Sequence, residues 1–274
     1  MRAEQKGRFE PSHDAHAIEQ VAIVVQFCRQ LDDEQLTAAV AAAGQFKDEL
    51  PGAAELPAVA IALGAIPVMP RLPNPLGGRI MNRMRPDGVV ESELRMERTA
   101  IVFRTTTYTR WADFWGQTRR YFEALLPIYA PAGEIGAVGL NYVDKFYWDG
   151  LAADIRPALL LRQGSRYVSP YIYEAGDLWH SHVGAFVRED QYVKRLVNIN
   201  LDCSDESRPT SRRVIAITTV LTDMLNQPGY RSITLAGSTV EFFSEKAEQL
   251  HADSKRAFAE VIDEQMCRRI ALTE

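Results

Sequence analysis

The sequence predicts an α+β fold in which two similar units pack as one body, with a mostly antiparallel sheet and helices on one face. Runs rich in β-branched and aromatic residues alternate with amphipathic helical segments. The order strand, helix, three strands, helix occurs twice, and TRWADFW near one final helix echoes STVEFFS at the other. This repeated order predicts an internal duplication.

The predicted organisation has three parts. A mobile N-terminal arm is expected at residues 1–17, a first α+β unit at 18–130 and a second at 131–274. A chain of 274 residues is long enough for one or two such bodies with a well-buried core.

In the first unit, residues 18–28 form an apolar, β-branched run that predicts a buried strand. Asp32 and Gln35 have the spacing of a capping box, which predicts a helix that ends at Pro51 and Gly52. Prolines and glycines punctuate residues 51–78, so a loop is expected there.

A three-stranded meander follows this loop. The turn sequence Pro86–Gly88 and a reversal near residues 97–99 separate its strands. Thr109 is expected to cap the next helix, which Pro127 and Pro131 are expected to close.

The second unit is predicted to repeat this order. Strands are expected at residues 135–148, 178–187, 195–202 and 213–221, with a short helix at 151–161. Ser238 and Glu241 have the spacing of a capping box, which predicts a final helix reaching about Cys267.

Two motifs, GLNYVDKF at residues 139–146 and LHADSKRAF at 250–258, together with the element order, suggest a family. The chain resembles a sporadically distributed family of uncharacterised bacterial proteins of about this length, over most of its sequence. Asn141 stands where members of that family usually carry a basic residue. The resemblance implies no activity and no catalytic residues.

Composition excludes several classes. Three cysteines, Cys28, Cys203 and Cys267, lie far apart without metal-binding spacing, which favours a reducing cytoplasm over a disulfide framework. Cys28 and Cys267 are expected to be buried and Cys203 to be exposed near a turn. No apolar run reaches the length of a membrane span, and nucleotide-binding, serine hydrolase and zinc protease motifs are absent. No cofactor is therefore expected.

Arginines dominate the basic residues and cluster between positions 71 and 120. Ten arginines and five acidic residues give this segment a charge of 10 − 5 = +5, although the whole chain carries −5. Arginine suits protein interfaces and anionic partners. The sequence therefore predicts a partner-binding surface made of six arginines: Arg79, Arg83, Arg85, Arg95, Arg98 and Arg104. Nucleic-acid binding through residues 79–120 is an alternative, although the acidic pI of 5.7 does not favour it.

The histidines supply the other candidate chemistry. His180 and His182 lie two residues apart on a predicted strand, so both imidazoles share a face, and Asp202 on the next strand could join them. Two histidines and an aspartate suit a divalent metal or an acid–base pair. A solvated sheet face explains the same alternation. His13 and His16 fall in the expected arm, and His251 at the boundary of the final helix.

These observations favour a non-enzymatic binding or regulatory protein, an accessory bacterial protein acting through a protein partner or through self-association. A homo-oligomer without membrane contact is expected. The first alternative is a metal-dependent or acid–base enzyme centred on His180, His182 and Asp202, and the second is nucleic-acid binding.

Overall fold

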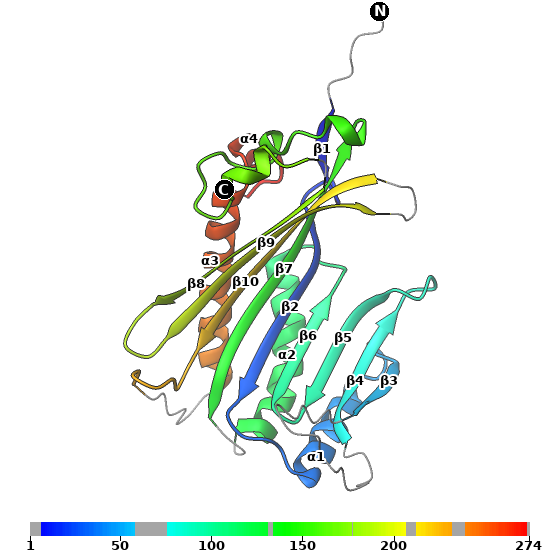
Figure 1. The fold of residues 1–274 in the computed structure, drawn as a ribbon. Coiled ribbons are helices and arrows are strands. Elements are labelled where there is room, and N and C mark those ends of the chain that lie inside the picture. Colours follow the sequence, from blue (N-terminus) through cyan, green and yellow to red (C-terminus); the bar gives the residue numbers. More distant parts are fainter. Residues whose placement is uncertain are drawn as a thin grey trace, which may run out of the picture. The chain divides into compact units, whose positions relative to one another are not determined.

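The computed structural model describes residues 7–57, 76–130, 134–176, 178–206, 212–231 and 239–272. Its α-helices are α1 (Asp33–Ala43), α2 (Trp111–Tyr129), α3 (Thr239–Val261) and α4 (Glu264–Arg269). Its strands are β1 (Arg8–Pro11), β2 (Ile18–Phe27), β3 (Gly52–Pro57), β4 (Leu76–Met84), β5 (Val90–Glu97), β6 (Ala100–Thr105), β7 (Ile135–Asp149), β8 (Trp179–Arg188), β9 (Lys194–Glu206) and β10 (Arg212–Met224). Figure 1 traces these elements along the chain.

The predicted fold class is wrong. The ten strands form one large sheet in the order β3-β4-β5-β6-β2-β7-β10-β9-β8, with β1 paired to β7. Every pairing with an assigned register is antiparallel. The chain is thus a β-rich protein built on a large antiparallel sheet, and the helices are a smaller part of it than an α+β class implies.

The predicted duplication is not evident either. The 11-residue helix α1 follows β2, whereas only short 3-10 turns follow β7. These turns are Ala152–Asp154, Pro157–Leu159 and Pro170–Tyr173. Two of them begin with proline, which removes a backbone donor and interrupts a longer helix. The first half also gains β3, within the segment expected to be a loop. Residues 58–75 of that segment lie outside the described residues.

The chain divides into two compact units. The first unit comprises Met1–Val21, Gly139–Met224 and Glu245–Glu274, and the second comprises Ala22–Val138 and Leu225–Ser244. The chain crosses from one unit to the other within β2 and within β7, so each unit combines segments of both predicted halves.

In the second unit, the predicted meander of β4, β5 and β6 is present, and β3 pairs with β4 beside it. Gly88 has a φ of +82°, a conformation that glycine adopts without strain, in the predicted turn between β4 and β5. The capping box of α1 is confirmed. The Asp32 carboxylate accepts a hydrogen bond from the Gln35 backbone N–H, and the Gln35 side-chain oxygen accepts one from the Asp32 backbone N–H. The helix nevertheless ends at Ala43, well before Pro51.

Helix α2 differs from its prediction at both ends. Arg110, rather than Thr109, is the N-cap residue, and the Thr109 hydroxyl donates instead to the Asp113 carboxylate at 2.8 Å. Pro127 lies inside the helix, which continues to Tyr129. Pro131 lies outside the described residues.

Aromatic rings hold α2 against β6 and against the turn that follows α1. Phe103 of β6 stacks on Phe114 at 5.6 Å and meets Tyr121 edge-on at 5.0 Å, while Phe46 of that turn meets Tyr121 edge-on at 4.6 Å. Each of these rings is nearly or fully buried, and a buried ring contributes about 1.5–3 kcal/mol relative to an exposed one.

In the first unit, β9 pairs with β10 over 13 residues and with β8 over ten. Long registers of this kind fix the face of every side chain, because successive residues point to opposite sides of the sheet. Residues 8–11 of the expected mobile arm form β1, which pairs with the end of β7. Ten-residue β8 is the last strand in the order and forms one edge of the sheet (Figure 1).

Helix α3 covers one face of the first unit's sheet. Phe146 of β7 stacks on Phe258 at a centroid distance of 6.4 Å, and Tyr142 contacts His251. The predicted single helix is interrupted at Ile262, because Asp263 caps a separate helix α4. The predicted capping residue Ser238 lies outside the described residues. No helix in the described part of the chain is long and apolar enough to cross a membrane.

Candidate functional site

The histidine pair lies where the sequence predicts it, on the edge strand β8. His180 faces Asp202 and His182 faces Asn200 on β9. The His180 Nδ1 atom lies 2.5 Å from the Asp202 carboxylate, and the two side chains are 61% and 45% exposed. This face is turned away from α3. Arg195 of β9 bonds to α3, and Asn200 and Asp202 point to the opposite side because side chains alternate along a strand. We call these side chains the histidine face.

Uncommitted hydrogen-bonding atoms accompany the histidines. The amide oxygens of Asn198 and Asn200 are shielded from solvent and have no hydrogen-bond partner. Gly184, opposite Asn198, leaves space beside them, since a Cβ there would lie 3.4 Å from His182 Nε2 and 3.9 Å from Asn198 Oδ1. Unsatisfied polar atoms are rare in native proteins, so this face has unused capacity to bind polar groups or water.

One chain does not complete a metal site. Across the residues that the structure describes, no group of three or more histidine, cysteine, aspartate or glutamate side chains is arranged to hold an ion. The His13 and His16 rings lie tilted to each other with their centroids 4.8 Å apart, and these two rings alone fall short of a full ligand set. The histidine face therefore offers one His–Asp pair and one further imidazole.

The arginine-rich segment, in contrast, is satisfied within the fold. Glu93 is 4% exposed and pairs with both Arg95 and Arg104, the latter at 3.0 Å. Burial would raise the pKa of Glu93, but the hydrogen bonds from these two guanidinium groups outweigh it and lower the pKa. The two cations thus stabilise a buried carboxylate.

The other four predicted partner-binding arginines also have intramolecular partners. Arg79 pairs with Glu55 at 3.7 Å, Arg83 donates to the carbonyls of Asp48 and Glu49, Arg85 pairs with Asp87 at 3.4 Å, and Arg98 donates to the Leu31 carbonyl and to Asp33. All six side chains therefore already bond within the chain. The positive charge of this segment is therefore engaged in contacts within the chain.

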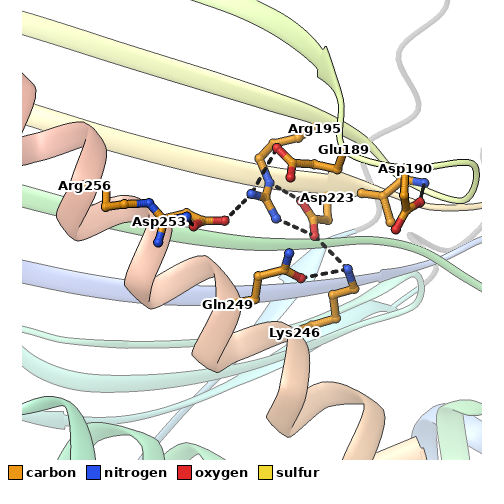
Figure 2. Close-up of polar contacts among 9 residues, drawn as sticks. Glu189, Asp190, Arg195, Asp223, Lys246, Gln249, Asp253 and Arg256 are labelled. Carbon is orange, nitrogen blue, oxygen red and sulfur yellow. Dashed lines mark hydrogen bonds and ion pairs between the residues drawn. The ribbon is translucent and has the colours of Figure 1, made fainter.

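A charged cluster that sequence reasoning missed joins β9, β10 and α3 on the opposite face (Figure 2). Arg195 is 2% exposed and Asp223 is fully buried. The guanidinium group donates twice to the Asp223 carboxylate, at 2.5 and 3.0 Å, and also bonds to Asp253. Lys246 donates to Asp223 at 3.2 Å. We call these four residues the Arg195 cluster.

Outer residues complete the Arg195 cluster. Glu189 pairs with Arg195 at 3.2 Å, and Arg256 pairs with Asp253 (Figure 2). Burial opposes the charge of Arg195, but Asp223 and the other carboxylates outweigh it and raise its pKa. A cavity of about 260 Å³ adjoins the cluster, lined by Arg166, Tyr167, Val187, Glu189, Arg195, Val197, Leu221, Asp253, Arg256, Ala257 and Glu260. With Glu189 and Arg256 included, three cations balance three anions, and the ion pairs of the Arg195 cluster link α3 to β9 and β10.

The two motifs that carry the family resemblance meet between β7 and α3. Tyr142 OH lies 2.9 Å from His251 Nδ1, and Phe146 stacks on Phe258. Asp144 lies between Tyr142 and Phe146 on the same face of β7. It is 3% exposed, and burial raises its pKa to about 8.

His251 is perturbed in the opposite direction. Burial, with a smaller contribution from Lys255, lowers its pKa to about 4. Ser254, one helical turn further along α3, is also buried and its hydroxyl has no hydrogen-bond partner. Asp144 and His251 are therefore both uncharged near neutral pH, which fits a structural role better than acid–base chemistry.

Two cysteine predictions are wrong. Cys203 is buried, because it neighbours Asp202 on β9 and therefore points to the opposite face, toward α3. Cys28 is exposed just after the end of β2. Cys267 is buried on α4, as predicted. Loss of hydration raises the pKa of both Cys28 and Cys267, so neither thiol is activated.

Comparison with known proteins identifies no family: neither a family model nor a curated protein matches this sequence.

Proposed function

We propose that the protein is a non-enzymatic binding protein that associates with a second copy of itself by pairing the β8 edges. One observation carries the proposal. Strand β8 ends the sheet, and its backbone hydrogen bonds in the described structure go to β9 on one side only. Among the described residues, no backbone bond joins the other edge of residues 179–187, and the N–H and C=O groups of an open edge are a template for another strand.

The side chains of β8 and of Leu178, which precedes it, support this reading. Leu178, Phe186 and Val187 are 56%, 59% and 44% exposed, an unusual concentration of apolar surface on one short segment. Edge strands that avoid association usually carry lysine, proline or a bulge. The sequence WHSHVGAFVR has neither lysine nor proline, and its pairing with β9 has no register shift.

A second copy is the occupant that this edge fits best. An antiparallel ladder has local two-fold symmetry, so identical strands pair without any change of shape, and two-fold dimers are the commonest oligomers.

Proline substitutions test the proposal. Successive residues direct their N–H groups to opposite edges of a strand, so either Gly184 or Ala185 has its N–H directed away from β9. We call the proline variant at that residue the outward variant. Of Gly184→Pro and Ala185→Pro, it is the one expected to keep the fold and to raise the dimer dissociation constant about 10-fold to 100-fold. The reason is that each copy loses a ladder bond worth about 0.5–1.5 kcal/mol. Sedimentation equilibrium measures this constant.

A charge variant provides an independent check in case proline disturbs folding. Phe186→Lys places a lysine on the exposed edge and is expected to weaken the dimer, whereas Leu151→Lys changes a residue that is 74% exposed outside β8 and serves as the matched control. A wild-type chain that stays monomeric at high micromolar concentration would contradict the proposal and favour a different protein as the strand donor. Equal association of both lysine variants and wild type would also contradict it.

A further inference from the structure

We propose that two paired β8 edges bind one divalent transition-metal ion, with Zn²⁺ as the best fit, through His180 and His182 of each copy. This inference rests on the proposed self-association. The two imidazoles of one chain lie two residues apart on one face of an exposed edge strand. Neutral imidazole is a preferred ligand of Zn²⁺.

His180 has the orientation that a metal ligand needs. Its Nδ1 atom faces the Asp202 carboxylate at 2.5 Å, which fixes Nδ1 as the donor and leaves Nε2 available. Metal-binding histidines almost always donate their other ring nitrogen to a carboxylate, carbonyl or water, and such partners hold the ring in place. Asp202 comes from the neighbouring strand, so the sheet register itself sets this pair.

His182 is placed to act with it. Its Nε2 atom lies over Gly184, where the missing side chain leaves the ring room to turn. The residue opposite is Asn200, whose amide oxygen is unpaired. No carboxylate competes for His182 in the described hydrogen bonds and ion pairs, so this imidazole is open to an incoming ion.

One chain supplies only half of a tetrahedral ligand set. In an antiparallel pair of β8 strands whose two-fold axis passes at residue 181, each His182 faces His180 of the partner subunit on one face of the joined sheet. Facing Cβ atoms in such pairs are about 4.5–5.5 Å apart, which is within reach of a shared ion. Binding of one ion by all four imidazoles therefore selects this register of the paired strands.

The experiment titrates Zn²⁺ alone into the chelator-treated full-length protein. Direct metal analysis is expected to give one bound ion per two chains, and sedimentation is expected to show at least about a 10-fold lower dimer dissociation constant with Zn²⁺ than with chelator. His180→Ala and His182→Ala should each abolish both effects. His13→Ala, which changes a histidine outside β8, is the matched control and should behave as wild type.

A conservative variant tests the orienting role of Asp202. Asp202→Asn keeps the shape but weakens the hydrogen bond to His180, so the affinity for Zn²⁺ should fall about 10-fold to 100-fold while the stoichiometry stays the same. Binding of one ion per chain, no Zn²⁺ binding, or unchanged binding by His182→Ala would overturn the inference. A dimer that forms equally well in chelator and is broken by the outward proline variant would overturn only the metal site. Failure of the proline variants to affect the dimer would overturn the proposed function itself.

Discussion

Replacing Asp223 with alanine is expected to lower the free energy of unfolding by about 3–5 kcal/mol, because it removes the fully buried carboxylate that Arg195 and Lys246 share. Arg195 is 2% exposed and donates two hydrogen bonds to this one carboxylate. Water cannot replace the lost partner at so buried a position. Asp223→Asn should be destabilising as well, since it keeps the shape and removes the charge.

Chemical denaturation with far-ultraviolet circular dichroism measures this loss. The matched control is Glu123→Ala, which breaks the exposed pair with Arg119 on α2, where the side chains are 49% and 46% exposed. Exposed pairs of this kind contribute about 0–1 kcal/mol. If Asp223→Ala cost no more than this control, the Arg195 cluster would not be the clamp between α3 and the sheet.

Asp144→Asn is expected to stabilise the protein at neutral pH. The folded chain holds the Asp144 proton up to a pKa of about 8, whereas the unfolded carboxyl ionises near 3.8. Folding must therefore take up a proton between these two pH values, and stability decreases as the pH rises through this window. At pH 7 the expected penalty is on the order of 4 kcal/mol, which the neutral amide avoids.

The pH dependence isolates this effect. His251, whose pKa burial lowers to about 4 in the fold, is present in both proteins, so its own titration cancels when their stabilities are compared between pH 6.5 and 8. Wild type should lose about 1.4 kcal/mol of stability per pH unit relative to Asp144→Asn in this range, and the difference should level off above pH 8. Parallel pH profiles of the two proteins would show that Asp144 does not hold a proton in the fold.

Local sequence signals were sufficient for most strands and turns. The alternation in β8 and β9 correctly placed His180, His182 and Asp202 on one face, since a strand has a fixed period of two. The capping box of Asp32 and Gln35 and the turn at Gly88 were equally local. Each of these features depends on residues that are close in the chain or on adjacent strands.

The features that sequence reasoning missed depend on distant partners. Asp223 lies 28 positions and Asp253 58 positions after Arg195, and no local pattern shows that the three side chains meet. The best available signal was a charged residue inside each of two apolar strands, since such a charge needs a buried partner. The intramolecular partners of the clustered arginines could not be predicted either, because Glu49 and Leu31 lie far from Arg83 and Arg98 in the sequence.

The central claim, pairing of β8 edges between two copies, is tested most directly by hydrogen exchange of the backbone at two protein concentrations. In the dimer the outward N–H groups of β8 are bonded to the second copy, and on dilution to monomer they become exposed. Peptides covering residues 179–188 are therefore expected to exchange faster at low concentration, while peptides from β10, which is paired with β9 within the same chain, stay protected. Exchange in β8 that does not change with concentration would contradict the claim.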